Sequence, residues 1–280
     1  MIANRFRKLS AVLLIIVLSY VLLGDDFTQP VNSQEATTEP AADFSEPEWD
    51  GTLRRINVPI LMYHYISEIP GGADQYRINL TITPGVFRQH VEYMFSEGYT
   101  TISMYDLNEA LLTGKPLPIK PVILTFDDGY SDHYTHALPI LQEFGFTGTF
   151  FIITARADAN DPNHLNWEQI REMADAGMSM ESHTKDHFDL RGRDEDFLVY
   201  QMLGSIESLE HYTGRPSRMF SFPIGHYDGR TLEVADSLPI WRAVTTENGS
   251  LHTTTNRLLL PRVRISNGMG AAAIASLLRG

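Results

Sequence analysis

Short apolar runs alternate with amphipathic segments over residues 58–265 of this 280-residue chain. Each apolar run has the length of a buried strand, and the segments between them carry the signals with which helices begin and end. Because strands and helices alternate, the pattern predicts an α/β fold with a parallel sheet closed into a barrel, or a close relative. The predicted strands are 58–63, 121–126, 149–153, 178–181, 218–222, 241–245 and 258–265, and the predicted helices are 83–98, 105–112, 132–144, 166–177, 195–212 and 230–237.

Two of the helix starts carry distinct capping patterns. Thr83 stands directly before Pro84, and Asn166 is followed three residues later by Gln169. The first turn of a helix has free N–H groups. A proline there has no N–H to satisfy, and the side chains of an Asn-x-x-Gln capping box accept hydrogen bonds from such groups. These positions are therefore expected to be N-caps.

The first 24 residues have the composition of an export signal. Arg5, Arg7 and Lys8 precede an apolar run from Ala11 to Leu23. This length suits the apolar part of a signal peptide better than a full membrane span of ~20 residues. No small-x-small cleavage site follows, so a membrane anchor through residues 9–23 is the alternative. Either way, the protein is expected outside the cytoplasmic membrane, secreted or anchored to it.

Residues 25–57 are predicted to form an acidic, disordered linker ahead of a catalytic domain at 58–280. Residues 25–50 carry eight acidic side chains and neither Lys nor Arg. Such a segment lacks the apolar surface needed to fold, so residues 1–57 are expected to be dispensable for catalysis. The whole chain has a net charge of −13. Nucleic acid is not an expected partner, because binding it requires a basic face.

Two adjacent carboxylates, Asp127 and Asp128, directly follow the predicted strand 121–126. Their burial is costly and adds nothing to a core, whereas parallel α/β folds place their chemistry at the carboxyl ends of strands. Capping of the next helix is the alternative interpretation. The position favours a functional site.

Two histidines, His183 and His187, follow the predicted strand 178–181 in a segment with the character of a loop. The chain contains no cysteine, so any metal must be held by nitrogen and oxygen ligands. The pair is weak on its own, and the zinc-protease pattern His-Glu-x-x-His is absent. Together with the two carboxylates, the histidine pair supplies three metal ligands and leaves one carboxylate to act as a base. This combination indicates a metal-dependent hydrolase.

Three motifs together resemble those of the polysaccharide deacetylases, carbohydrate esterase family 4, also called the NodB homology domain. The chain reads Thr125-Phe126-Asp127-Asp128-Gly129, then His183-Thr184-x-x-His187, then Phe220-Ser221-Phe222-Pro223-Ile224-Gly225. The resemblance covers roughly residues 58–265. It implies a distorted (β/α) barrel, in a single catalytic domain, that removes N- or O-acetyl groups from glycans. It also implies that Asp128, His183 and His187 bind one divalent metal ion, with Asp127 as the catalytic base.

These roles agree with the chemistry of the residues. Three protein ligands leave room for water and a substrate oxygen at a catalytic metal. The ion acidifies water and polarises the carbonyl while Asp127 takes the proton. Zinc is the expected ion, although cobalt, nickel or iron would suit the same ligands.

The chain departs from the usual family pattern in two places. Many members have an arginine where Ser221 stands, and a late Leu-x-His segment that supplies the general acid, whereas this chain reads Leu259-Leu260-Pro261-Arg262. His64 after the first strand resembles the acid of a circularly permuted subgroup that includes exported poly-β-1,6-N-acetylglucosamine deacetylases. The resemblance thus implies that His64 is the general acid and that Arg262 steadies Asp127. A core histidine and a surface salt bridge are the respective alternatives.

Six further residues are candidates for contact with the substrate. Pro223 and Gly225 shape a tight turn in which a backbone N–H near Ile224 is expected to stabilise the oxyanion. Tyr130 is a candidate to stack on a sugar ring, as are Trp167 and Trp241, although aromatic residues at such spacing more often belong to a core.

The sequence therefore predicts a metal-dependent enzyme that removes N-acetyl groups from an extracytoplasmic N-acetylglucosamine polysaccharide. The candidate substrates, in order, are poly-N-acetylglucosamine, peptidoglycan and chitin-like oligomers. The alternatives are an O-acetyl esterase acting on a glycan such as xylan, a metal- and glycan-binding protein without catalysis, and an iron oxygenase with the same ligand set. The oligomeric state is left open.

Overall fold

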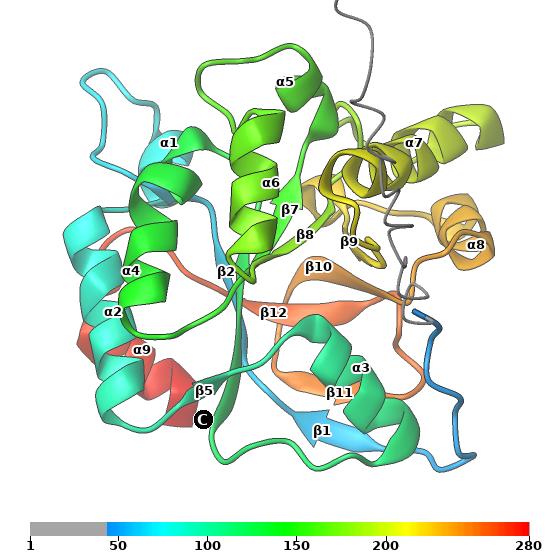
Figure 1. The fold of residues 1–280 in the computed structure, drawn as a ribbon, viewed down its shortest axis with the longest axis horizontal. Helices are drawn as coiled ribbons and strands as arrows, with labels where there is room; N and C mark the ends of the chain where they lie inside the picture. The colour runs from blue at the N-terminus through cyan, green and yellow to red at the C-terminus, as the bar shows by residue number, and fades with distance from the viewer. Residues whose placement is uncertain (1–43, 280) are drawn as a thin grey trace, which may run out of the picture. The chain divides into compact units, whose positions relative to one another are not determined.

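Seven parallel strands close into a barrel in the computed structural model, which describes residues 44–279. The order around the ring is β2-β12-β10-β9-β8-β7-β6, and β6 pairs back onto β2 (Figure 1). The predicted parallel barrel is thus confirmed. The ring consists of β2 (Ile60–Tyr63), β6 (Pro121–Phe126), β7 (Thr149–Ile152), β8 (Ser179–Ser182), β9 (Met219–Ser221), β10 (Arg242–Asn248) and β12 (Leu260–Arg264).

Helices cover the outside of this ring, as the sequence pattern predicts (Figure 1). Thr83 caps α2 through its side chain with Pro84 in the first turn, and Asn166 and Gln169 form a capping box at α6. The main helices are α2 (Pro84–Ser96), α3 (Met104–Thr113), α4 (Leu138–Glu143), α6 (Trp167–Asp175), α7 (Glu195–Thr213), α8 (Gly229–Ser237) and α9 (Ala271–Arg279).

Several short elements have no counterpart in the sequence prediction, and neither does α9. Strands of two or three residues are too short to show a periodic pattern, and helices of five residues barely complete one turn. These elements are β1 (Arg55–Asn57), β3 (Tyr65–Ile66), α1 (Gln75–Asn79), β4 (Thr81–Ile82), β5 (Thr100–Thr101), α5 (Thr154–Asp158) and β11 (Leu251–Thr253).

The predicted helix 132–144 differs from the observed one in its first turns. His133–Ala137 form a π-helical turn, and α4 begins only at Leu138. Pro139 explains the change, because it has no N–H to donate and its ring crowds the carbonyl one turn earlier. A wider turn before the proline relieves that crowding.

Buried apolar side chains fill the interior of the barrel. One cluster includes a fully buried side chain from each of six ring strands, which places it inside the ring. Its strand members are Ile60, Ile123, Phe151, Met219, Val244 and Leu260. The interior is therefore packed, and the predicted site residues Asp127, Asp128, His183 and His187 follow the carboxyl ends of β6 and β8.

The segment 44–57 belongs to the folded domain, which corrects the predicted linker boundary at residue 57. β1 pairs antiparallel with β11, and the Phe44 ring stacks on Trp241 with ring centroids 5.1 Å apart. Arg54 also donates a hydrogen bond of 2.9 Å to the Leu112 carbonyl. A few dispersed apolar residues are enough here because they dock on a surface already formed by the barrel. The rest of the predicted linker, 25–43, lies outside the described residues.

Within residues 44–279, none of the helices combines the length and the apolar character that a membrane crossing requires. The predicted signal peptide or anchor at 1–24 lies outside this part of the chain.

Candidate active site

The residues singled out from the sequence converge at one mouth of the barrel. Because parallel strands end at the same edge, side chains that follow different strands in the sequence meet there. They line a pocket of about 310 Å³. The pocket brings together six of the predicted site residues: His64, Asp127, Asp128, His183, His187 and Ile224.

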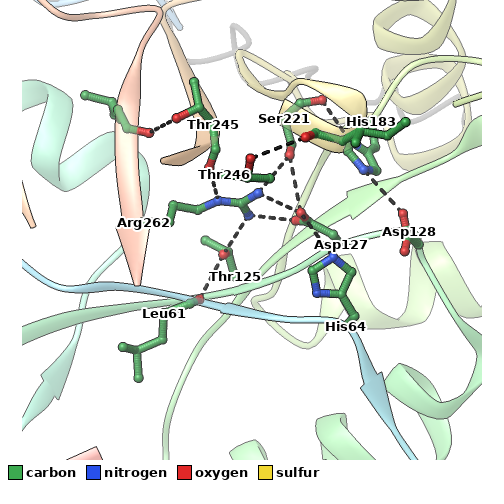
Figure 2. Close-up of polar contacts among 12 residues, drawn as sticks. Leu61, His64, Thr125, Asp127, Asp128, His183, Ser221, Thr245, Thr246 and Arg262 are labelled. Atoms are coloured by element: carbon green, nitrogen blue, oxygen red, sulfur yellow. Dashed lines mark hydrogen bonds and ion pairs between the residues drawn. The ribbon is translucent and has the colours of Figure 1, made fainter. Parts of the chain in front are cut away.

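A buried ion pair between Asp127 and Arg262 lies at the base of this mouth (Figure 2). Arg262 Nη1 donates to Asp127 Oδ1 at 2.8 Å and Nη2 donates to Oδ2 at 2.6 Å, so the contact is bidentate. Arg262 is 0% exposed and Asp127 is 2% exposed. The surface salt bridge considered for Arg262 is therefore wrong.

The remaining N–H groups of Arg262 are also satisfied. Nε donates to the Thr245 carbonyl at 2.9 Å, Nη1 to Thr125 Oγ1 at 3.1 Å and Nη2 to Ser221 Oγ at 3.2 Å. This network fixes the guanidinium plane and, through it, the Asp127 carboxylate. Ser221, at the position where the resemblance would place an arginine, therefore faces the guanidinium of Arg262.

The electrostatics of Asp127 follow from this pairing. Burial alone would raise the pKa of its carboxyl, but the Arg262 guanidinium overcomes that effect and lowers the pKa to about 2. Asp127 is thus held as an anion whose orientation is set by two hydrogen bonds.

Asp128, His183 and His187 form a second cluster beside this pair. One donor atom from each lies within 4.8 Å of the others, a geometry that can hold a metal ion. Asp128 Oδ1 lies 3.3 Å from His183 Nε2 and 3.4 Å from His187 Nε2. Two imidazoles and one carboxylate form a donor set suited to zinc and other divalent transition metals.

The orientation of His183 supports its assignment as a ligand. Its Nδ1 donates to the Ser221 carbonyl at 2.7 Å, which leaves Nε2 free to face Asp128 and His187. Histidine ligands typically place one ring nitrogen on the metal and donate from the other. Ser221 therefore touches both halves of the site, through its hydroxyl on Arg262 and its carbonyl on His183.

The pKa shifts in the cluster have distinct causes. Burial opposes charge on the His183 ring, but the contact with Asp128 outweighs it and raises the pKa of His183. Burial and the neighbouring His183 lower the pKa of His187 to about 4. Burial would raise the pKa of Asp128, yet the histidines beside it lower that pKa overall.

His64 follows β2 and lines the same pocket as Asp128, His183 and His187. Its Nε2 lies 4.0 Å from Asp127 Oδ2, and Figure 2 shows the ring directed toward that carboxylate. Burial lowers the pKa of His64, while Asp128 and Asp127 act in the opposite direction. The ring lines the pocket, so it does not serve simply as a core histidine.

The backbone at the mouth is strained. Four non-glycine residues there have left-handed backbones, with φ of 75° at Asp128, 68° at Thr184, 61° at His187 and 61° at Ile224. Such conformations persist only where surrounding contacts hold them, and they concentrate at functional sites. At His187 one such contact is the hydrogen bond of 2.9 Å from its N–H to Thr184 Oγ1.

The predicted oxyanion turn is a short 3₁₀ turn, Pro223–Gly225, directly after β9. Thr246 Oγ1 donates to the Ile224 carbonyl at 3.3 Å. A Cβ at Gly225 would lie 2.2 Å from the same Thr246 Oγ1, and Gly225 has φ of +75°. Only glycine fits this close approach, and the preceding residue Ile224 lines the pocket.

None of the three candidate sugar-stacking residues lines the catalytic pocket. Tyr130 stacks on Tyr65 with ring centroids 3.7 Å apart and lines a separate pocket. Trp167 stacks on Tyr212, and Trp241 stacks on Phe44. For the two tryptophans the alternative of packing within the protein holds.

Several pocket residues were not singled out from the sequence, among them Tyr76, Thr246 and Arg264. Tyr76 comes from the short helix α1 and Thr246 from the far end of β10, where no motif marks them. Arg264 could have been predicted from the sequence, because residues two apart on a strand share a face and Arg262 was already a predicted site residue.

Comparisons with known proteins agree with this geometry. The family model for polysaccharide deacetylase matches residues 114–242. YxkH of Bacillus subtilis, whose name assigns it to the polysaccharide deacetylases, is 32% identical over 261 residues, covering 87% of this chain and 90% of that protein. Poly-β-1,6-N-acetyl-D-glucosamine N-deacetylase of Escherichia coli is 30% identical over 119 residues, covering 38% of this chain and 18% of its own length.

A solved structure extends the similarity to the fold. The Streptococcus pyogenes deacetylase PplD, in complex with acetate, has a TM-score of 0.75 and 30% identity, covering 80% of this chain and 99% of that chain. Together with the barrel and the site, these similarities show that the chain belongs to the polysaccharide deacetylase family, whose members are hydrolytic enzymes.

Proposed function

We propose that this polysaccharide deacetylase removes N-acetyl groups from an N-acetylglucosamine polysaccharide outside the cytoplasmic membrane, with a divalent metal ion as cofactor. The observation that carries the proposal is the arrangement at the barrel mouth. A buried, ion-paired carboxylate stands beside a three-ligand cluster, and an imidazole lies 4.0 Å from that carboxylate.

Asp127 is the proposed base. It accepts a proton from the water that attacks the acetyl carbon, and Arg262 keeps it anionic and aligned for that transfer. A divalent ion held by Asp128, His183 and His187, zinc in our proposal, supplies Lewis-acid chemistry toward the water and the carbonyl.

His64 is the proposed acid. As the C–N bond breaks, the departing nitrogen needs a proton to leave as an amine, and His64 is placed on the pocket wall to provide it. The Ile224 backbone is proposed to stabilise the developing oxyanion. The balanced result is one water consumed, with acetate and a free amine formed.

The proposed substrate draws on the named relatives. The Escherichia coli relative acts by name on poly-β-1,6-N-acetyl-D-glucosamine, and PdaA of Bacillus subtilis, 30% identical over 105 residues, acts by name on peptidoglycan N-acetylmuramic acid. Poly-N-acetylglucosamine is the first candidate, because His64 and Arg262 occupy positions that resemble the subgroup acting on it. The proposed location rests on the export-signal composition of residues 1–24.

Acetate release from a panel of defined N- and O-acetylated oligosaccharides tests the proposal. We expect release from N-acetylglucosamine oligomers that a chelator abolishes and added zinc restores. Full activity in the presence of chelator would contradict the proposed dependence on a metal ion. Release from O-acetylated xylan oligomers alone would identify an esterase. Fractionation of cells producing the full chain tests the location, and recovery in the cytoplasm would contradict it.

A further inference from the structure

A buried histidine that does not line the catalytic pocket, His133, contacts the backbone of the proposed acid. His133 is 0% exposed, and its Nε2 lies 2.6 Å from the His64 carbonyl oxygen. A carbonyl only accepts hydrogen bonds, so Nε2 carries the hydrogen and donates it. The Asp132 carboxylate, 3.8 Å from the same nitrogen, is too far away to compete. The contact therefore reaches His64 through its backbone and not through the pocket.

The backbone at His64 lies where strand pairing stops. The carbonyl of Tyr63, the last residue of β2, accepts from the Asp127 N–H at 3.0 Å. Tyr65 already belongs to β3 and donates to the Leu80 carbonyl at 3.2 Å. His64 thus stands between two strands and belongs to neither. Its carbonyl is held by a side chain where a strand residue would be held by its ladder partner.

The imidazole of His64 has few contacts that could fix its orientation. Its Nδ1 is buried and has no hydrogen-bond partner among the described residues. Its Nε2 lies 4.0 Å from Asp127 Oδ2, which is beyond hydrogen-bond distance (Figure 2). In many histidines that transfer protons, a hydrogen bond at the second ring nitrogen sets the orientation of the ring. For His64, the place of the ring therefore depends on the place of its backbone.

His133 is itself held by aromatic rings. Its ring packs against Phe126, Phe150 and Tyr130, with ring centroids 5.6, 5.5 and 5.9 Å apart. Phe126 is the last residue of β6 and directly precedes Asp127, the proposed base. His133 also begins the π-helical turn before α4, and single turns of this kind are frequent at functional sites. Through His133, the end of β6 is thus tied to the residue that follows β2.

We propose that His133 is a positioning residue for the deacetylation reaction. Its hydrogen bond to the His64 carbonyl holds the proposed acid where it can protonate the departing nitrogen. The inference rests on the proposed function, because it takes His64 to be the acid. His133 itself exchanges no proton with the substrate. Loss of the hydrogen bond should therefore slow each substrate to the extent that its leaving group needs the acid.

Two leaving groups test this role in the full chain supplied with zinc. Acetate release is measured from an N-acetylglucosamine oligomer, whose amine needs a proton to leave, and from para-nitrophenyl acetate, whose leaving group does not. His133→Phe keeps a ring among the aromatic neighbours and removes the donor. We expect kcat on the amide to fall about 10²-fold, the effect of a misplacement of about 1 Å, and kcat on the ester to fall less than about tenfold. KM and metal content should stay near those of the unmodified protein.

His133→Gln tests the hydrogen bond itself. Its amide nitrogen is separated from the backbone by as many bonds as Nε2 of histidine, so it can donate to the same carbonyl. Most of the activity on the amide should return. A glutamine variant as slow as His133→Phe would overturn the inference.

His252→Phe is the matched control. His252 is also 0% exposed, and its Nε2 also lies close to a backbone carbonyl, 2.9 Å from that of Val58. It belongs to β11 and does not line the catalytic pocket. His252→Phe should lower the thermal stability as His133→Phe does, but leave the ratio of the amide and ester rates unchanged. Equal losses of His133→Phe on both substrates would reduce His133 to the same structural role.

A double variant shows whether His133 acts through His64. In His64→Ala, the further change His133→Phe should cost no additional activity on the amide, because the group that it positions is gone. Losses that multiply would contradict the inference. If His133→Phe does not fold, His133→Leu, which is smaller and also lacks a donor, replaces it in every comparison and is judged by the same outcomes.

Nuclear magnetic resonance of the histidine rings keeps this test separate from the proposed function. If no N-acetylated oligomer releases acetate, the proposed function fails, whereas the isotope-labelled ring of His64, assigned from the spectrum of His64→Ala, still reports on its position. We expect one sharp set of His64 ring signals in the unmodified protein and in His133→Gln, and shifted, broadened signals in His133→Phe. His64 signals that are the same in all three proteins would contradict the inference even where the amide is hydrolysed.

Discussion

At the scale of single residues, removing one partner of the Asp127–Arg262 pair is expected to cost more stability than the intact pair contributes. Both groups are buried, so each offsets the cost of desolvating the other. Arg262→Met would leave the Asp127 charge buried without its partner. We expect a loss of about 3–5 kcal/mol in the free energy of unfolding, measured by urea denaturation, together with loss of acetate release.

The double variant Asp127→Asn with Arg262→Met distinguishes charge from shape. Removing both charges should recover much of the lost stability while the protein stays inactive, because the base is gone. Arg171→Met, at an exposed position on α6, serves as the control and should unfold like the unmodified protein. A single Arg262→Met variant with unchanged stability would show that the pair contributes little.

Asp127→Asn alone tests the proposed base. Asn keeps the size of the side chain but cannot take up the proton from water, so turnover should fall by ~10²–10⁴-fold. Metal content should stay near that of the unmodified protein, since the proposed ligands are Asp128, His183 and His187. Acetate release and metal analysis of the purified variant check this, and near-normal turnover would leave Asp127 a structural role only.

His64→Ala tests the proposed acid with two leaving groups. N-acetyl substrates need a proton on the departing nitrogen, whereas an activated O-acetyl ester leaves without much help. We expect a loss of ~10²–10⁴-fold on the amide, a smaller loss on the ester and little change in metal affinity. Rates on the two substrates are compared in one preparation. Equal losses would argue against proton donation by His64.

At the scale of elements, the short turns after the strands hold the site in place. The turn Pro223–Gly225 follows β9 and brings Ile224 to the pocket. Gly225→Ala would place a methyl group against Thr246 at a left-handed position. We expect a cost of at least about 1–3 kcal/mol in stability and a marked loss of turnover, measured by thermal unfolding and acetate release.

Gly229 provides the control for this substitution. It lies at the start of α8 with no atom within 4 Å of an added Cβ and without a positive φ. Gly229→Ala should be neutral or slightly stabilising, since alanine favours helix. If both variants have the same stability and turnover, the close approach of Gly225 to Thr246 is not important for either property.

At the scale of the whole molecule, the segment before β2 completes the domain. Deleting residues 1–57 would remove β1 and the Phe44–Trp241 stack along with the residues that the structure does not describe. We expect the chain 44–280 to unfold like the full chain, and 58–280 to lose ~2–4 kcal/mol through the missing strand pairing and aromatic contact. Urea denaturation of the two truncated chains decides this. Equal midpoints would restore the predicted boundary at residue 57.

Local patterns in the sequence determined the elements of the barrel and part of the site. The ring strands and the caps of α2 and α6 are found close to their predicted places, because strand length, helix period and capping chemistry are local properties. The Asp127-Asp128 pair and the two histidines are also short-range motifs. Parallel strands bring such motifs together whatever separates them in the chain.

Only the tertiary structure decided how the remaining groups combine. Arg262 is 135 residues from Asp127 in sequence, and its guanidinium also donates to Ser221 on β9, a strand that pairs with neither β12 nor β6. The docking of residues 44–57 and the pocket formed by Tyr65, Arg77 and Asp132 likewise need surfaces from distant segments. Contacts between segments far apart in sequence leave no periodic trace in either one. Most elements of this fold can therefore be predicted from the local sequence. The contacts within the site form only once the barrel has closed.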